Sequence, residues 1–341
     1  MRSPSYLPSN FSTKPSVVTD AGLFYISEKR TMATDRAIWQ SFAGYADRDA
    51  TFEIYVDEVL VYSGNAYVAP DEDEVTIRAN DIVRDYVSAS VPTFAGGTVV
   101  SKNIKAPTAD LYINDELAES ARLIPNWSYD KAHNIYAMAD PIDGIADPRS
   151  IIPYSFIAES GATKQPKVDI KLADGSVFSP TFANVSAGTA GVDAEDATEV
   201  TFDDLTTYRI ESTCKRYALY YVNAFGGVDL YIPKGQCTKA TNYDRSEYLR
   251  SSLAKYQSKT FKTDAVDSWS LNTGLMTEEQ SMKMHHLIGS NDVRLFDMET
   301  GEWVSVKITD SSLTYKTYAN SGRTFPVYTI NVESAETRER R

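Results

Sequence analysis

The chain has 341 residues and a formal net charge of −13, with 42% hydrophobic and 24% charged residues. Domains of about 100 to 150 residues are the commonest, so this length predicts two or three domains, each able to bury a core. The composition is that of a folded globular protein and excludes a disordered chain, and the acidic excess argues against gripping nucleic acid through phosphate contacts.

The charge is unevenly divided along the chain. Residues 1–205 contain 16 Lys/Arg and 31 Asp/Glu, whereas residues 206–341 contain 18 and 16. No apolar run reaches the roughly 18 residues of a membrane-spanning helix, and the start of the chain is polar with three prolines. We therefore expect a protein that avoids membranes and folds in the cytoplasm of the producing cell.

The first expected element is a hairpin from Thr51 to Gly64. Apolar residues alternate with polar ones over 52–56, the acidic pair at 57–58 breaks the run, and a second strand follows toward a turn at Gly64. After an acidic loop at 71–74, the alternation resumes at Val75 and Ile77, and Asn80 and Asp81 begin a short helix through Tyr86. This predicts a first β-domain ending near Pro92.

Short apolar runs separated by turn residues continue to about residue 200 and predict a second β-domain with long loops. Its clearest hairpin pairs residues 168–172 with Val177 and Phe178, and Asp174 and Gly175 are expected to supply the positive φ angles of the turn. The stretch from Ala183 to Ala197 is small and acidic, so we expect a flexible excursion there.

A third β-region begins with a tyrosine-rich strand at 217–222, a turn, and a second strand at 228–232. In a hairpin that turns at Phe225 and Gly226, the two residue numbers of each cross-strand pair add up to 451. Tyr221 then lies beside Leu230, and Cys214 lies opposite Cys237. The two cysteines are then read as a disulfide, a metal pair or unreactive thiols. The lack of a second CxxC or a nearby histidine argues against zinc.

A helix is predicted at 277–288, because Thr277 and Gln280 have the spacing of a capping box and Gly289 follows the apolar face. Four alternating runs come after it, at residues 293–296, 303–308, 313–318 and 325–332, and they predict a meander. The basic end with Arg338, Arg340 and Arg341 is read as a solvated tail or, alternatively, as a docking segment.

Known catalytic and nucleotide-binding motifs (GxSxG, GxxxxGK[ST], GxGxxG, HExxH) do not occur. Adjacent helical residues point about 100° apart, so His285 and His286 do not form a chelating face, and we assign them a surface or interface role. His133 lies in an aromatic segment with Trp127, and a sugar-binding role there is a minor alternative. Asp140, Asp143 and Asp147 resemble a calcium loop only loosely, and a structural loop is favoured. We therefore predict no enzyme, no cofactor and no metal.

These patterns predict a mainly β protein of two or three β-sandwich or meander domains with few short helices. The expected divisions are an N-terminal arm (1–40), a first β-domain (41–92), a second β-domain with long loops (93–205), a C-terminal β-domain with one helix (206–334), and a basic tail (335–341).

Two segments carry a family resemblance. Residues 214–235, CKRYALYYVNAFGGVDLYIPKG, and residues 271–297, LNTGLMTEEQSMKMHHLIGSNDVRLFD, are similar to structural proteins from tailed phages of Bacteroidetes, including crAss-like phages. Weaker similarity extends to residues 52–87 and 126–130. Several family members have Trp where Val228 stands here.

The resemblance implies a non-enzymatic subunit of a virion neck, tail hub or distal tail that forms a six- or twelve-fold ring around the DNA path. Its partners are then copies of itself and neighbouring phage proteins, with DNA passing unbound during ejection. We expect the subunit contacts to include seven residues from the turn and the helix: Tyr221, Asn223, Phe225, Gly226, Gly227, His285 and His286. The alternative is a carbohydrate-binding host-recognition module, suggested by Trp127 and Trp303 on β-domains.

Overall fold

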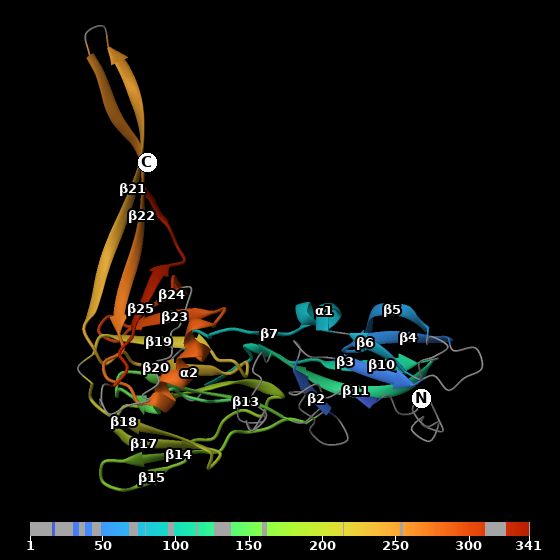
Figure 1. The fold of residues 1–341 in the computed structure, drawn as a ribbon. Coiled ribbons are helices and arrows are strands. Elements are labelled where there is room, and N and C mark those ends of the chain that lie inside the picture. Colours follow the sequence, from blue (N-terminus) through green and yellow to red (C-terminus); the bar gives the residue numbers. More distant parts are fainter. Residues whose placement is uncertain are drawn as a thin grey trace.

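A computed structural model describes the backbone of residues 16–17, 30–33, 38–42, 49–67, 74–78, 80–94, 99–113, 115–125, 138–158, 162–213, 215–252, 255–310 and 325–340. The fold is mainly β, as the sequence predicts, with several antiparallel sheets and few helices. The ribbon shows an N-terminal lobe at one end, a central body, and a long hairpin that projects from the body (Figure 1).

Two sheets build the N-terminal lobe. One has the order β1 (Ser16–Val17), β3 (Ile38–Phe42), β6 (Glu74–Arg78). The other has the order β2 (Arg30–Ala33), β11 (Glu116–Ile124), β10 (Thr108–Ile113), β4 (Asp49–Val56), β5 (Val59–Tyr67).

The predicted hairpin in this lobe is confirmed as β4 and β5. Its turn residues Asp57 and Glu58 both have positive φ, which suits a two-residue hairpin turn. Gly64, however, does not form a turn: it lies inside β5 opposite Phe52, where an added Cβ would press on the Phe52 and Tyr62 rings.

The expected division at residue 92 does not separate these sheets. β10 and β11 follow residue 92, yet they pair with β4 and β2 in the first lobe. Residues 1–40 likewise contribute strands β1, β2 and part of β3 and are more than an arm. The order of the chain does not predict that β10 and β11 return to the first sheet, because a strand joins whichever sheet edge is open to it.

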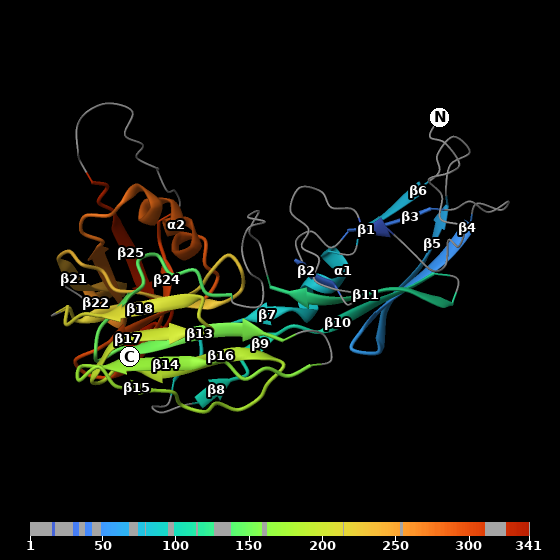
Figure 2. The ribbon, with the colours of Figure 1, turned by 90° about the horizontal axis from the view of Figure 1, so that it is seen from below.

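The connection to the body contains the helix α1 (Asn80–Val83), the 3₁₀ helix η4 (Arg84–Tyr86), and the short pair β7 (Ser88–Ala89) and β9 (Ile104–Lys105) (Figure 2).

Two sheets form the lower part of the body. Their strand orders are β12 (Ile145–Ala146), β18 (Thr206–Ile210), β17 (Ala197–Phe202), β14 (Val168–Leu172), β15 (Val177–Phe178), and β13 (Ile151–Ile157), β16 (Ala187–Asp193), β8 (Val99–Ser101). The hairpin β14–β15 is confirmed, although only Gly175 of its turn has positive φ.

The flexible excursion expected at 183–197 is wrong. This stretch contains β16, of which residues 187–192 are all buried. Its small residues reflect crowding: a Cβ at Gly188 would meet the carbonyl oxygen of Ser101, and one at Gly191 would meet the ring of Phe94. A composition typical of disorder therefore arises here from close packing.

The C-terminal sheet has the order β20 (Val228–Tyr231), β19 (Tyr217–Val222), β23 (Val293–Asp297), β24 (Glu302–Ile308), β25 (Thr329–Ser334), β22 (Lys255–Asn272), β21 (Cys237–Ser252), and β26 (Arg338–Arg340) pairs with β22. Helix α2 (Glu278–Ile288) begins with the predicted capping box of Thr277 and Gln280. The run predicted at 313–318 lies outside the described residues.

The hairpin β19–β20 is confirmed, but its register is off by one. Tyr220 pairs with Leu230, so paired positions sum to 450 and the turn is the five residues Asn223–Gly227. β20 ends at Tyr231, and Cys237 instead begins β21 opposite Leu271. Cys237 is a free thiol, and Cys214 lies outside the described residues.

One hydrophobic core joins the middle and C-terminal regions. Tyr154 and Phe202 from the lower sheets belong to the same buried cluster as Tyr220, Leu230 and Phe296 from the C-terminal sheet. The expected division at residue 205 therefore runs through a shared core, and these two regions form one body.

Candidate functional site

The turn Asn223–Gly227 is organised by a buried asparagine. The Asn223 side-chain oxygen accepts hydrogen bonds from the backbone N–H groups of Phe225 (2.9 Å) and Gly227 (3.0 Å). Its amide nitrogen donates to the Met138 carbonyl oxygen (2.7 Å) and to a carboxylate oxygen of Asp229 (2.7 Å). Asn223 is completely buried, so this one side chain satisfies four polar groups that water does not reach.

The two glycines of this turn are required by close packing. Gly226 has φ +81°, and a Cβ there would overlap the carbonyl oxygen of Pro125. A Cβ on Gly227 would overlap the carbonyl oxygen of Met138. The turn is therefore clamped against residues far away in the sequence, and it does not form an open anion cradle.

His286 links α2 to this turn. Its Nδ1 accepts from the backbone N–H of Ala224 (3.1 Å), and its Nε2 lies 3.2 Å from a carboxylate oxygen of Asp140. Lys283 Nζ contacts the same carboxylate at 2.9 Å. Burial raises the pKa of Asp140, but the hydrogen bonds from His286 and Lys283 outweigh it and hold that pKa well below its usual range.

The pKa of Asp229 is shifted in the opposite direction from that of Asp140. Burial raises its pKa to about 6, and the nearby Asp140 charge adds to the rise despite the hydrogen bond from Asn223. One of its oxygens and the hydroxyls of Tyr208 and Tyr221 are buried without a hydrogen-bond partner among the described residues. A shifted carboxyl is a common mark of a reactive site, but the side chain of Asp229 is completely buried within the chain.

The seven residues expected at a subunit interface are therefore corrected. Six of them are enclosed within the chain. The side chains of Tyr221, Asn223, Phe225 and His286 are buried, and Gly226 and Gly227 pack against Pro125 and Met138. His285 alone is partly exposed, and its Nδ1 lies 2.6 Å from the Met282 carbonyl oxygen. Their polar and glycine-rich character suggested an interface, but the sequence does not show which segments cover them.

The acidic residues of the segment 140–147 are held separately. Asp143 contacts Lys234 Nζ at 2.8 Å, and Asp147 binds the Arg149 guanidinium at 2.8 Å together with Thr213. Within the described ranges, no group of three or more His, Cys, Asp or Glu side chains is arranged to hold a metal ion. His133 and Trp127 lie outside the described residues.

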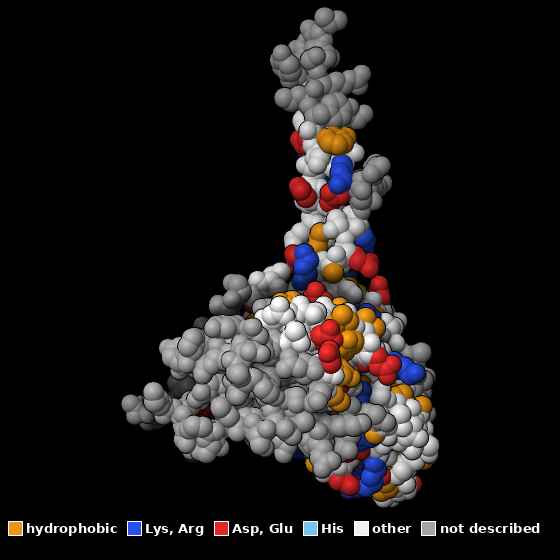
Figure 3. All heavy atoms as spheres, turned by 90° about the vertical axis from the view of Figure 1, so that its right-hand side faces the viewer, with side chains coloured by type: hydrophobic (Ala, Val, Ile, Leu, Met, Phe, Trp, Pro, Cys, Tyr) orange, Lys and Arg blue, Asp and Glu red, His pale blue; other side chains and the backbone are white. Residues whose placement is uncertain are grey.

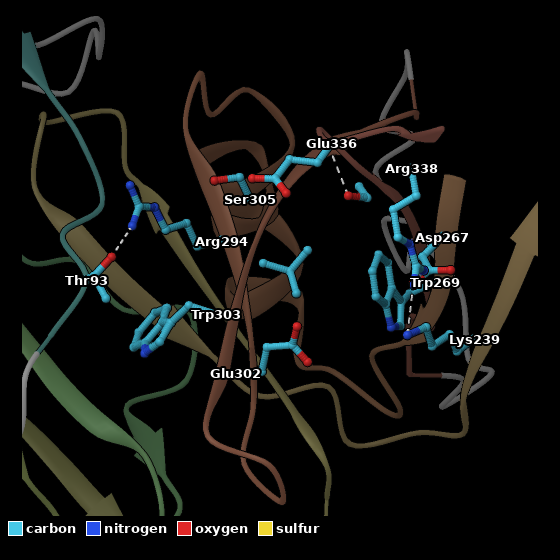
Figure 4. A pocket seen from close by; sticks show the side chains of 12 residues that line it. Thr93, Lys239, Asp267, Trp269, Arg294, Glu302, Trp303, Ser305, Glu336 and Arg338 are labelled. Carbon is cyan, nitrogen blue, oxygen red and sulfur yellow. Dashed lines mark hydrogen bonds and ion pairs between the residues drawn. The ribbon is translucent and has the colours of Figure 1, made fainter. Parts of the chain in front are cut away.

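A polar pocket of about 420 Å³ lies where the long hairpin leaves the body (Figure 4). Trp303 lies on one side with Arg294 and Thr93, and Trp269 lies on the other with Lys239 and Asp267. The remaining lining residues are Glu302, Val304, Ser305, Ser334, Glu336 and Arg338.

Asp267 anchors the outer wall of this pocket. It contacts Lys239 Nζ (3.0 Å), the Thr241 hydroxyl (2.7 Å) and the guanidinium of Arg338. Burial raises the pKa of Asp267, but the hydrogen bonds from Thr241 and Lys239 bring it below its ordinary value. Residues 338–340 form β26 and pair with β22, so this part of the basic C-terminal segment is a strand of the sheet and not a free tail.

The long hairpin, which we call the arm, consists of β21 and β22 (237–272). β21 is the edge strand of its sheet and pairs with β22, whereas β22 also pairs with β25 over residues 268–272 and with β26 over residues 263–265. At its base, Asp267, Trp269 and Leu271 of β22 are buried, but beyond them four consecutive residues, 242–245, are exposed, so neither face of the ribbon is covered there. Tyr243 is 63% and Phe261 56% exposed, and Figure 3 shows charged and hydrophobic side chains along the arm. β22 buries alternate residues only at its base, at Asp267, Trp269 and Leu271, and this alternation is too short to predict the arm from the sequence.

No protein-family model matches this chain, and no curated protein matches it in sequence. Among the described helices, none is long and apolar enough to cross a membrane.

Proposed function

We propose that this protein is a non-enzymatic structural subunit that assembles into a ring in the neck or tail of a phage virion. The observation that carries the proposal is the arm. The base of β22 pairs with β25 and β26, but beyond it the arm is a two-stranded ribbon without a covering layer. Such a ribbon is marginally stable in water by itself, and contact with a second surface would stabilise it.

The body supplies what such a subunit needs. Its two lower sheets and the C-terminal sheet share one core, and buried hydrogen bonds fix the turn Asn223–Gly227 inside it. The body is thus a rigid base from which the arm projects. The sequence resemblance of residues 214–235 and 271–297 to phage structural proteins supports the same proposal.

The charge distribution supports a place beside DNA. Residues 1–205 carry the acidic excess, and carboxylates facing a channel repel phosphate, so DNA passes without being trapped. The partners are then copies of the chain and neighbouring neck or tail proteins. The protein folds in the host cytoplasm before it enters the virion.

The test is the mass of the purified protein by light scattering, followed by electron microscopy of the largest species and of the virion. We expect closed rings of six or twelve copies and an antibody label at the neck or tail. A protein that stays monomeric at all concentrations and is absent from virions would contradict the proposal.

The pocket at the arm base favours one alternative, a carbohydrate-binding module, because it combines two tryptophans with charged groups. Sugars stack on open aromatic faces, yet Trp269 is only 4% exposed. Trp303 packs on Tyr220 and Phe296 at ring-centroid distances of 4.7 and 4.6 Å. We therefore place this function second. Saturable binding of host capsular glycan that Trp303→Ala abolishes would favour it over the ring.

A further inference from the structure

The N-terminal lobe presents a second uncovered surface, on its five-stranded sheet. The register places two rows of residues on the face opposite the buried Ile54 and Leu111. This outer face consists of Tyr55, Leu60, Asp110 and Ser120 in one row, and Glu53, Ser63, Tyr112 and Leu117 in the next. All eight residues are partly or fully exposed.

The outer face is both apolar and acidic. Leu60 is 47% and Leu117 51% exposed, and the rings of Tyr55 and Tyr112 meet edge-on at 5.1 Å between them. The eight residues include the carboxylates of Glu53 and Asp110 and no Lys or Arg, and Arg122 in the next row is buried. The exposed turn residues Asp57, Glu58 and Asp115 add further negative charge at its borders.

The arm has the complementary chemistry. By sequence, residues 245–262 contain five Lys/Arg and one Asp/Glu, with Asp244 and Asp264 on either side, and among the described side chains Arg245 is exposed. Exposed Tyr243 and Phe261 place aromatic rings beside this positive charge. Basic and aromatic groups on one surface and acidic and apolar groups on the other form the pairing that steers and fixes protein–protein contacts.

The two surfaces do not meet within one chain, since the arm projects from the body and the lobe lies at the opposite end (Figure 1). We infer that the arm of one copy docks on the outer face of the β2–β11–β10–β4–β5 sheet of the next copy. The contact joins two different surfaces, so it repeats head to tail and closes into a ring when the rotation between copies allows. This inference rests on the proposed self-assembly and names the surfaces that make it.

The arm is long enough for this contact. β21 has 16 residues, and strands rise about 3.3 Å per residue, so the arm extends roughly 50 Å from its first to its last pair. That length exceeds the width of a five-stranded sheet, about 20 Å at 4.8 Å between strands.

A directed cross-link tests the contact. Both native cysteines are replaced by serine, and then one variant receives Arg245→Cys on the arm and another receives Asp110→Cys on the outer face. We expect a disulfide-linked dimer when the two variants are mixed and oxidised, and little dimer from either variant alone.

A charge exchange provides a second readout that does not depend on oxidation. Arg245→Glu should raise the concentration needed for assembly at least about tenfold, and Asp110→Arg in the same chain should restore most of it. The matched control is Lys171→Glu on β14, an exposed residue of the body with the same type of charge reversal, and it should leave assembly unchanged.

The outcomes separate this contact from the proposed function. Rings that form without the mixed cross-link and are insensitive to Arg245→Glu would overturn the contact and leave the ring proposal standing. Cross-links within a single variant would show a symmetric contact and overturn the head-to-tail arrangement. A protein that neither assembles nor cross-links would overturn both.

Discussion

Two hairpins of the C-terminal sheet, β19–β20 and β21–β22, differ in how far they are buried. In the buried hairpin β19–β20, every residue of both strands and the whole turn is buried. In the arm β21–β22, which starts six residues later, the described side chains are all partly or fully exposed except at the base of β22, where Asp267, Trp269 and Leu271 are buried. The buried hairpin contributes to folding of one chain, whereas the arm has value only for contacts outside that chain. Substitutions in the buried hairpin should therefore alter the stability of the chain, and substitutions in the arm should alter assembly.

The largest expected effect is on Asn223. Asn223→Ala leaves the N–H groups of Phe225 and Gly227 and the Met138 carbonyl without their partner. Since each buried group left unsatisfied costs about 1–3 kcal/mol, we expect a loss of about 4 kcal/mol in the free energy of unfolding. Chemical denaturation followed by circular dichroism measures it.

The matched control for this substitution is Asn242→Ala on the arm, where the amide contacts only Ser268 at 3.3 Å and is exposed. We expect a change within about 0.5 kcal/mol. Equal losses of stability from the two substitutions would contradict the claim that the buried hairpin stabilises the chain and the arm does not.

The next effect is a pH dependence centred on Asp229. Its folded-state pKa of about 6 lies above the ordinary value of 3.8, so the folded chain holds the proton more tightly than the unfolded chain. Stability from this group is therefore present below about pH 4 and lost as the pH rises toward 6, in total about 3 kcal/mol. Asp229→Asn removes this loss.

We therefore expect Asp229→Asn to unfold at higher denaturant concentration than the natural chain at pH 7, and at a similar concentration at pH 4. Asp244→Asn on the exposed arm serves as the control and should leave the difference between the two pH values unchanged. If Asp229→Asn instead destabilised the protein at pH 7, the carboxylate charge would be needed for folding.

The smallest effect on stability is expected at Tyr243. Tyr243→Ala removes a side chain that is 63% exposed, so the free energy of unfolding should change by less than about 0.5 kcal/mol. Assembly measured by sedimentation should weaken at least about tenfold, because the aromatic ring belongs to the proposed contact. Leu275→Ala, at a residue that is 68% exposed and outside the arm, is the matched control and should assemble normally.

Local patterns of the chain predicted many elements correctly. The alternation at residues 52–56 gave β4, the acidic pair Asp57–Glu58 gave its turn, and the capping box at Thr277 gave the start of α2. These features depend on neighbours within a few residues, where the periods of strands and helices and the needs of helix ends are readable. The mainly β class follows from the same signals.

The tertiary structure alone decided what each element touches. In the structure, the small residues of β16 form a buried strand, the β19–β20 register differs by one position from the predicted one, and the turn Asn223–Gly227, predicted at an interface, is buried. The structure also returns β10 and β11 to the first sheet. Burial and register depend on contacts between residues far apart in the chain, which a local pattern does not encode. The arm buries alternate residues only at the base of β22, so the sequence contains too short a hydrophobic alternation to predict it.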